Sequence, residues 1–203
     1  MIRVVKNIQA PLSLSTTKQY DGEDVKRQLI EDQSQKCYLC ERTLVTDFEI
    51  EHLDSTGGRQ DWNNLFLACR YCNGKKLHYY DDILAPSSNN IEELIQQEID
   101  GNQALFTPLG SVGNTIKLLN SIHNGISKVR NIKEKHFFEY VKGQVNSFSA
   151  IVLKYCLEKS EDNRAAVTEE LDIHKEFLGF KYWIICSNAE LKADFANEIV
   201  WNK

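Results

Sequence analysis

The 203-residue sequence has little proline and glycine, a single methionine, and no apolar run long enough to cross a membrane. Three prolines and ten glycines are too few for a low-complexity linker, and the sequence shows no internal repeat of the solenoid type. The opening residues, MIRVVK, do not have the pattern of a signal peptide. We therefore expect a cytoplasmic protein with no membrane association and no disulfides.

The charge balance is mildly acidic. The chain has 24 Lys and Arg residues against 29 Asp and Glu residues, which gives a net charge of -5. A protein that binds nucleic acid unaided usually presents a basic surface, so this balance indicates that a partner delivers any nucleic-acid substrate. With 42% hydrophobic residues, the chain can bury a core as one domain or as a small domain docked on a larger one.

Four of the six cysteines form two Cys-x-x-Cys pairs, Cys37 with Cys40 and Cys69 with Cys72, separated by 28 residues. Two such knuckles supply the tetrahedral four-sulfur shell that structural zinc prefers. The alternative, buried thiols or a redox pair, requires two tight pairs to coincide by chance. Because a four-cysteine site has no open coordination position, we expect any catalysis to use other residues.

The remaining two cysteines stand alone in apolar segments, Cys156 in IVLKYC and Cys186 in YWIIC. Small thiols in such segments are typical of a hydrophobic core. We therefore expect both to be core residues and not metal ligands.

The segment between the knuckles predicts a strand, a loop, a second strand and the start of a helix. Phe48 and Ile50 alternate with acidic residues in a half-buried strand that ends near His52. Gly57-Gly58 marks a turn, and a second apolar run leads to a polar helix start over 70–76. Zinc binding by both knuckles would bring the strand end and the helix start together.

Three polar residues at these two positions suit phosphodiester hydrolysis. Glu51 and His52 lie at the end of the first strand, and Asn73 follows the last knuckle cysteine. An imidazole can take a proton from water near neutral pH, and carboxylate and amide oxygens are ligands for Mg²⁺ or Mn²⁺.

The segment resembles the HNH endonucleases, which have the ββα-metal fold. The resemblance is carried by CxxC at 37–40, EH at 51–52, NL at 64–65 and CxxCNxxK at 69–76. It implies that His52 is the general base, that Glu51 and Asn73 bind the catalytic ion, and that Asn64 holds the loop that orients the histidine. Glu51 stands where Asp is commoner in the family, and on a regular strand its side chain would point away from that of His52.

The residues of the motif, IEH followed by DWNNLFLACxxCN, resemble those of a narrower branch, the PtuB-like nuclease subunits of Septu-type anti-phage defence systems. NTIKLLN at 114–120 adds a weaker similarity. This resemblance implies an effector subunit that cleaves DNA in the cytoplasm and works with an ABC-type or AAA-like ATPase, the PtuA-like subunit.

Three basic residues near the helix start, Arg70, Lys75 and Lys76, are candidates for nucleic-acid contact, since backbone amides and cations there can hold a phosphate. The alternative is a solvated charged face of the helix.

The rest of the chain is predicted to be mainly helical, with an extended arm over 1–20. A helix in DGEDVKRQLIEDQ would place Val25, Leu29 and Ile30 on one face. Asn90 and Glu93 form a capping-box pattern that predicts a helix over 91–99, and another helix begins near Asn114. An apolar stripe follows one helix face at Val141, Val145, Phe148, Val152 and Tyr155.

The sequence therefore predicts an α+β protein, in which a small ββα-metal core with a four-cysteine zinc site is embedded in a mainly helical domain. We expect an N-terminal arm and helix over 1–36, the nuclease core over 37–80, and a helical region for packing and partner docking over 81–203. Two alternatives stay open: a non-catalytic zinc-knuckle module that binds nucleic acid or a partner, and an HNH nuclease that cleaves RNA or tRNA. The motif does not separate DNA from RNA, because it engages the phosphate.

Overall fold

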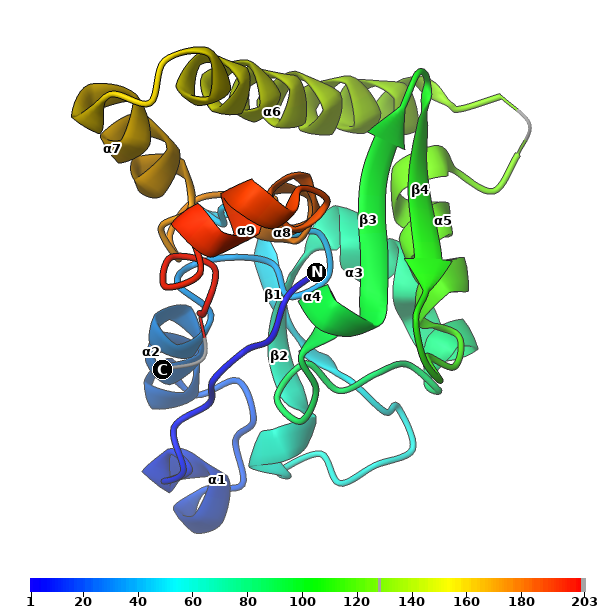
Figure 1. The fold of residues 1–203 in the computed structure, drawn as a ribbon. Helices are drawn as coiled ribbons and strands as arrows, with labels where there is room; N and C mark the ends of the chain where they lie inside the picture. The colour runs from blue at the N-terminus through cyan, green and yellow to red at the C-terminus, as the bar shows by residue number, and fades with distance from the viewer. Residues whose placement is uncertain (128, 202–203) are drawn as a thin grey trace.

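The computed structural model describes residues 1–127 and 129–201, except for the side chains of residues 78 and 79 (Figure 1). The α-helices are α1 (Leu12–Thr16), α2 (Glu23–Asp32), α3 (Arg70–Lys76), α4 (Ile91–Leu94), α5 (Thr115–Asn124), α6 (Ile132–Leu157), α7 (Glu161–Glu170), α8 (Leu178–Cys186) and α9 (Ala189–Asp194). The strands are β1 (Phe48–His52), β2 (Leu65–Cys69), β3 (Ile95–Asp100) and β4 (Gln103–Pro108), and short 3-10 helices cover Trp62–Asn64 and Leu77–Tyr80. The predicted α+β class is confirmed.

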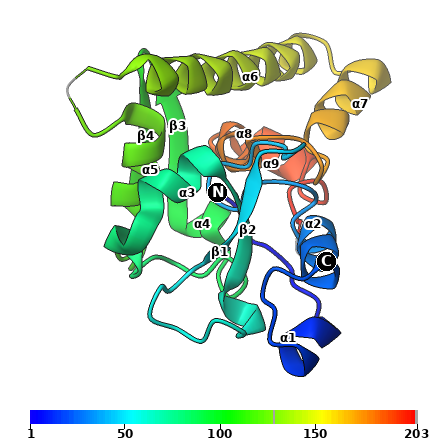
Figure 2. The same cartoon turned by 180° about the vertical axis from the view of Figure 1, so that it is seen from behind.

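The segment between the knuckles folds as a ββα unit. Strands β1 and β2 pair antiparallel, with Phe48 opposite Cys69 and His52 opposite Leu65. Helix α3 starts directly after β2 and packs on both strands (Figure 2). The predicted order of strand, loop, strand and helix is confirmed, because the alternation of apolar and acidic residues in β1 produces one half-buried face.

The prediction of a helix over 91–99 is wrong. Helix α4 is a single turn, and the chain continues as β3, which pairs antiparallel with β4. Asp100 faces Gln103 across the two-residue turn Gly101-Asn102, and Gly101 has a positive φ of 54°. Gly and Asn are favoured in such hairpin turns because they tolerate a positive φ, and this turn signal outweighs the helical pattern before it.

The other predicted helices are present. Helix α2 buries Val25 and Leu29, and α5 begins directly after Asn114. Along α6 the whole predicted stripe is buried: Val141, Val145, Phe148, Val152 and Tyr155. The N-terminal arm differs in one respect from the expectation, because it contains the short helix α1.

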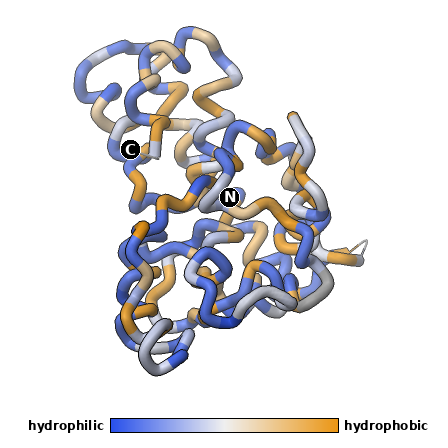
Figure 3. The backbone as a smooth tube through the Cα atoms, turned by 90° about the horizontal axis from the view of Figure 1, so that it is seen from below, coloured by the Kyte–Doolittle hydropathy of each residue, from blue (hydrophilic) through white to orange (hydrophobic). Residues whose placement is uncertain are grey.

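One hydrophobic cluster joins the ββα unit to the helices that follow it. It contains Leu67 of β2, Leu119 of α5, Phe138 of α6 and Phe180 of α8, whereas the distal part of α6 packs with α7 and α9 in a second cluster. Apolar and polar stretches alternate throughout the chain (Figure 3), as expected when amphipathic elements share a core. The division into three parts stays a prediction.

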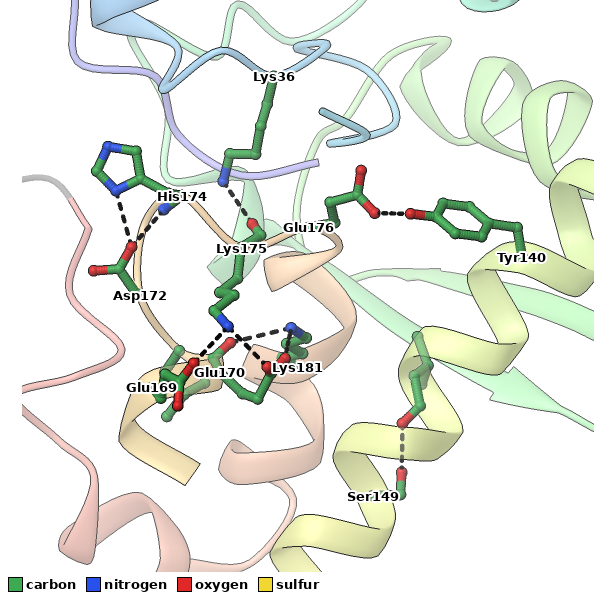
Figure 4. Close-up of polar contacts among 12 residues, drawn as sticks. Lys36, Tyr140, Ser149, Glu169, Glu170, Asp172, His174, Lys175, Glu176 and Lys181 are labelled. Atoms are coloured by element: carbon green, nitrogen blue, oxygen red, sulfur yellow. Dashed lines mark hydrogen bonds and ion pairs between the residues drawn. The ribbon is translucent and has the colours of Figure 1, made fainter. Parts of the chain in front are cut away.

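Polar contacts also tie the first knuckle to the loop between α7 and α8. The Lys36 ammonium donates to the backbone carbonyls of Ile173 and Lys175, the second at 3.0 Å, and the backbone N–H of Thr43 donates to the Glu176 carboxylate at 2.6 Å. Figure 4 shows Lys36 reaching this loop. The ββα unit is therefore held in place from its N-terminal side as well as through its core. No helix in the described residues combines the length and the apolarity needed to span a membrane.

His123 of α5 is a fully buried imidazole among aromatic rings. Its ring centroid lies 5.2 Å from that of Phe106, 5.3 Å from Phe137 and 5.5 Å from Phe180. Its Nδ1 has no hydrogen-bond partner in the described part of the chain. Burial lowers the pKa of His123 from its ordinary value of 6.5 to about 3, so this side chain is neutral in the folded protein at pH 7.

This burial predicts sensitivity to acid. Because the folded-state pKa lies below the unfolded one, the unfolded chain binds the proton more tightly, and stability falls as the pH drops below about 6.5. We expect His123→Leu to remove up to about 1.4 kcal/mol of this fall per pH unit, measured by urea unfolding between pH 7.5 and 5.5. The exposed His136→Gln is the matched control. If the unfolding free energy falls equally steeply with decreasing pH in wild type and His123→Leu, the prediction is contradicted.

Candidate active site and metal centre

The four knuckle cysteines converge on one buried point. The Sγ atoms of Cys37, Cys40, Cys69 and Cys72 all lie within 4.8 Å of one another, and none of the residues is more than 2% exposed. A tetrahedral zinc ion with Zn–S bonds of about 2.3 Å requires sulfurs about 3.8 Å apart, which is close to the 4.0 Å between Cys40 and Cys69. The predicted cluster is confirmed, and its donor set fits zinc.

The chemistry of the thiols also fits a cation. Burial raises the pKa of Cys40 and of Cys72 well above the ordinary thiol value, so these two thiols disfavour ionisation without a compensating charge, whereas hydrogen bonds from the other three cysteines lower the pKa of Cys69. A bound divalent ion supplies that charge. The cluster also organises local structure, because the Sγ of Cys69 accepts a hydrogen bond from the Cys72 backbone N–H and caps α3.

The expectation of a core thiol is wrong for Cys156, whereas Cys186 packs against the second hydrophobic cluster without being fully buried. Cys156 is exposed near the end of α6, and Cys186 is half-buried at the end of α8. Val152 and Tyr155 are the buried residues of the first segment and Leu153 is exposed with Cys156, since a helix of period 3.6 exposes part of any continuous apolar run.

His52 lies where β1 ends and the loop over 53–64 begins. Its Nε2 is 3.2 Å from the backbone carbonyl oxygen of Arg59, and its ring lies 4.9 Å from that of Tyr20. A proton on Nε2 donated to this carbonyl leaves Nδ1 as the acceptor nitrogen. The loop backbone can therefore select the tautomer in which Nδ1 is able to take a proton.

Asn64 is the main polar anchor of this loop. Its side-chain oxygen accepts from the Asp54 backbone N–H at 2.8 Å, and its amide donates to the carbonyls of Asp54 at 2.9 Å and Gly58 at 3.4 Å. These hydrogen bonds hold both ends of the turn that includes Gly58. They are the contacts that a loop-holding role requires, and that role stays a prediction.

His52 and Asn73 line the same open pocket of about 330 Å³, together with Ser55, Arg59 and Leu77. The Asn73 amide nitrogen donates to the Glu49 carboxylate at 2.6 Å, which leaves its oxygen to accept or to bind an ion. The fold thus brings together the strand end and the helix start as expected. An amide oxygen is a suitable donor for Mg²⁺ or Mn²⁺.

Glu51 lines the inner side of this pocket, and its carboxylate is bound by two buried side chains. It is 7% exposed, its carboxylate is 2.7 Å from the Lys76 ammonium, and it accepts a hydrogen bond from the Tyr38 hydroxyl. Burial raises the pKa of Glu51, although Lys76 opposes the shift. Because these donors occupy both carboxylate oxygens, the more accessible oxygen donor is that of Asn73, and ligation by Glu51 stays a prediction.

The structure does not support nucleic-acid contact by Lys76. Its side chain has no exposed surface, and its ammonium also donates to the His52 carbonyl at 3.0 Å. Lys75 is turned inward too, because it is 15% exposed and pairs with Glu134 of α6. Arg70 alone of the three is open to solvent, with 70% of its side chain exposed, and it lies 3.2 Å from the Asp47 carboxylate.

Sequence reasoning missed Arg59 and Tyr20. The Arg59 guanidinium lies 5.0 Å from the centre of the Tyr20 ring and lines the pocket beside His52. Arg59 lies in the loop and Tyr20 in the N-terminal arm, and neither has a fixed spacing from the motif. No local pattern could have identified them, since loop closure and arm docking bring them to the histidine.

The fold and the site define the class of this segment as a ββα unit with a four-cysteine cluster whose donor set fits zinc. A family model described as HNH endonuclease matches residues 37–88, about a quarter of the chain. The match spans both knuckles, β1, β2 and α3. Searches of curated proteins and of solved structures found no match. The resemblance to an HNH endonuclease domain is therefore supported, and the narrower defence-system branch stays a prediction.

The metal centre predicts that one lost ligand unfolds the core. We expect Cys69→Ser to lose its zinc and more than about 4 kcal/mol of unfolding free energy, because two knuckles are released together. Zinc content per chain and urea unfolding are the measurements. The exposed Cys156→Ser is the control and should keep both. Full stability of Cys69→Ser without zinc would argue against a structural metal.

The buried pair of Glu51 and Lys76 predicts non-additive stability changes. Lys76→Met should cost about 3–5 kcal/mol of unfolding free energy, since it leaves a buried carboxylate without its cation. Glu51→Gln combined with Lys76→Met should recover much of this loss. A double-mutant cycle by urea unfolding measures the coupling, and additive losses would refute it.

Proposed function

We propose that this chain is a metal-dependent endonuclease that hydrolyses phosphodiester bonds. The observation that carries the proposal is the shared pocket of His52 and Asn73, formed within the segment that matches the HNH endonuclease model. The four-cysteine cluster lies apart from this chemistry, because its ligands fill the coordination shell of zinc.

In the proposed reaction, His52 removes a proton from the attacking water through Nδ1. Donation of its Nε2 proton to the Arg59 carbonyl orients the ring and favours the imidazolium form that follows. The Arg59 guanidinium, on the same pocket wall, is placed to bind a phosphate oxygen. A Mg²⁺ or Mn²⁺ ion held by Asn73, with Glu51 behind it, would neutralise charge at the phosphate and the leaving oxygen.

Loss of the histidine should abolish cleavage without unfolding the protein. We expect His52→Ala to lower the initial rate of supercoiled-plasmid nicking in Mg²⁺ or Mn²⁺ by about 100-fold or more, since it removes the general base. His174→Ala, at an exposed histidine in the loop between α7 and α8, is the control. Both variants should retain one zinc per chain.

If the wild-type chain cuts neither DNA nor RNA, alone or with a neighbouring ATPase, while its zinc content stays at one per chain, a non-catalytic binding module explains the fold better. We propose DNA as the substrate, and parallel digests of DNA and RNA test this choice. Cleavage of RNA alone would reassign the substrate and leave the chemistry of the pocket unchanged.

We also propose that an ABC-type or AAA-like ATPase, the PtuA-like subunit of an anti-phage defence system, delivers the substrate. The net charge of -5 supports this, because counterion release from phosphate contacts normally supplies much of the affinity for DNA. We expect a stable complex when the two proteins are mixed, measured by size-exclusion chromatography with light scattering. Full nuclease activity of the isolated chain, with no complex formed, would count against it.

A further inference from the structure

A second hollow, separate from the pocket of His52 and Asn73, lies between the start of α3 and the first turns of α6 and is lined by Arg70. It has a volume of about 790 Å³ and is open to solvent. This volume is within the range of pockets that hold a nucleotide-sized ligand. We call it the α3–α6 groove, and define it by Arg42, Arg70, Lys133 and His136 together with the aromatic residues described below.

The groove gathers positive charge on an acidic protein. Lys133 and His136 are exposed, and their side chains form no hydrogen bond or ion pair within the described residues. Arg42 likewise makes no ion pair with a carboxylate in the part of the chain that the structure describes. Arg70 pairs with Asp47, which lines the groove, and with Glu49. Among the described residues that line the groove, Lys133 and Arg42 are therefore cations without a carboxylate partner, and they are available for an anionic ligand.

The groove also presents aromatic surfaces that are fixed in position. The rings of Tyr71 and Phe137 lie 5.0 Å apart at its floor, and the Tyr71 hydroxyl donates to the Ile122 carbonyl at 2.6 Å. On the wall, Tyr140 is 42% exposed, and its hydroxyl donates to Glu176 (Figure 4). Aromatic faces beside cations are the features on which unpaired bases stack while their phosphates are neutralised.

The groove lies next to the candidate active site, because only one turn of α3 separates the residues that line them. Arg70 lines the groove and Asn73 lines the pocket, about 4.5 Å apart along the helix axis. Glu49 connects the two, since it lies 3.4 Å from the Arg70 guanidinium and accepts from the Asn73 amide. Stacked nucleotides are spaced by about 3.4 Å, so a strand crossing α3 reaches the groove within one or two nucleotides of the pocket.

We propose that the α3–α6 groove binds the unpaired nucleotides next to the scissile phosphate, with bases stacked near Tyr140 and phosphates held by Lys133, His136 and Arg42. This inference rests on the proposed nuclease function, and it adds that the preferred substrate has a single-stranded segment. An acidic protein segment is the competing occupant, but it would not require the aromatic surfaces.

Fluorescence anisotropy on the full zinc-loaded chain tests the proposal in a His52→Ala background, which prevents cleavage during the measurement. The probes are a labelled single-stranded 12-mer, its duplex, and an acidic peptide of matched charge. We expect the single strand to bind most tightly. Lys133→Glu should weaken this binding about tenfold and reduce the dependence of log Kd on log salt by roughly 0.7 or more, whereas Lys154→Glu, exposed far along α6, should change neither.

A second pair of variants isolates stacking. Tyr140→Leu should weaken single-strand binding about tenfold, and Tyr140→Phe, which keeps the ring but loses the bond to Glu176, should bind as the parent does. Zinc content and thermal unfolding show that each variant is folded.

Unchanged binding by Lys133→Glu and Tyr140→Leu would overturn the proposal, and so would tighter binding of the duplex or of the acidic peptide. Cleavage by chains with intact His52 separates this failure from failure of the proposed function. If the chain cleaves its substrate and neither variant changes KM, the proposed nuclease function holds and the proposed role of the groove fails. If the groove binds single strands but the chain cleaves nothing, the proposed nuclease function fails and the groove remains a binding site.

Discussion

The contact among four cysteine sulfurs is the constraint on which the rest of the candidate site depends. Cys37 and Cys40 precede β1, and Cys69 and Cys72 lie at the junction of β2 and α3. Closing the 28-residue segment between the pairs costs chain entropy, and metal binding can offset that cost. Once the knuckles meet, the end of β1 and the first turns of α3 face each other, and their side chains share a pocket. A metal bound by the four cysteines would thus support the proposed chemistry by positioning its residues.

A buried ion pair fixes Glu51 at the inner side of the pocket. Lys76 reaches from the end of α3 to the Glu51 carboxylate and to the backbone carbonyl of His52. Burying such a pair costs desolvation free energy, so the pair contributes little net stability. Its main effect is to orient the end of β1 relative to α3. A cation placed there is a positioning group for both the proposed base and the proposed metal ligand.

The helices outside the ββα unit give this small core its support. Lys75 pairs with Glu134 of α6, Tyr71 donates to α5, and the apolar cluster runs through β2, α5 and α8 without a break. A segment of about 50 residues buries little apolar surface by itself, so packing against these helices adds to the stabilisation that a bound metal would supply. The same packing creates the α3–α6 groove, so the supporting helices also shape the surface that meets a substrate.

The sequence by itself determined the features that depend on local spacing. The alternation in β1 and the stripe along α6 could be identified because each repeats at the period of its own structure. The knuckles could be identified by their Cys-x-x-Cys spacing, and the residues at 52, 64 and 73 by the resemblance of the segment to the HNH motif. Only the tertiary structure decided which charged side chains are open to solvent. Lys76 and Arg70 lie six residues apart on one polar helix, yet one is buried and the other is exposed. It also decided that Arg59 meets His52, and that the residues after α4 pair as a hairpin. Burial and long-range pairing depend on what packs against a segment, and no pattern within the segment contains that information.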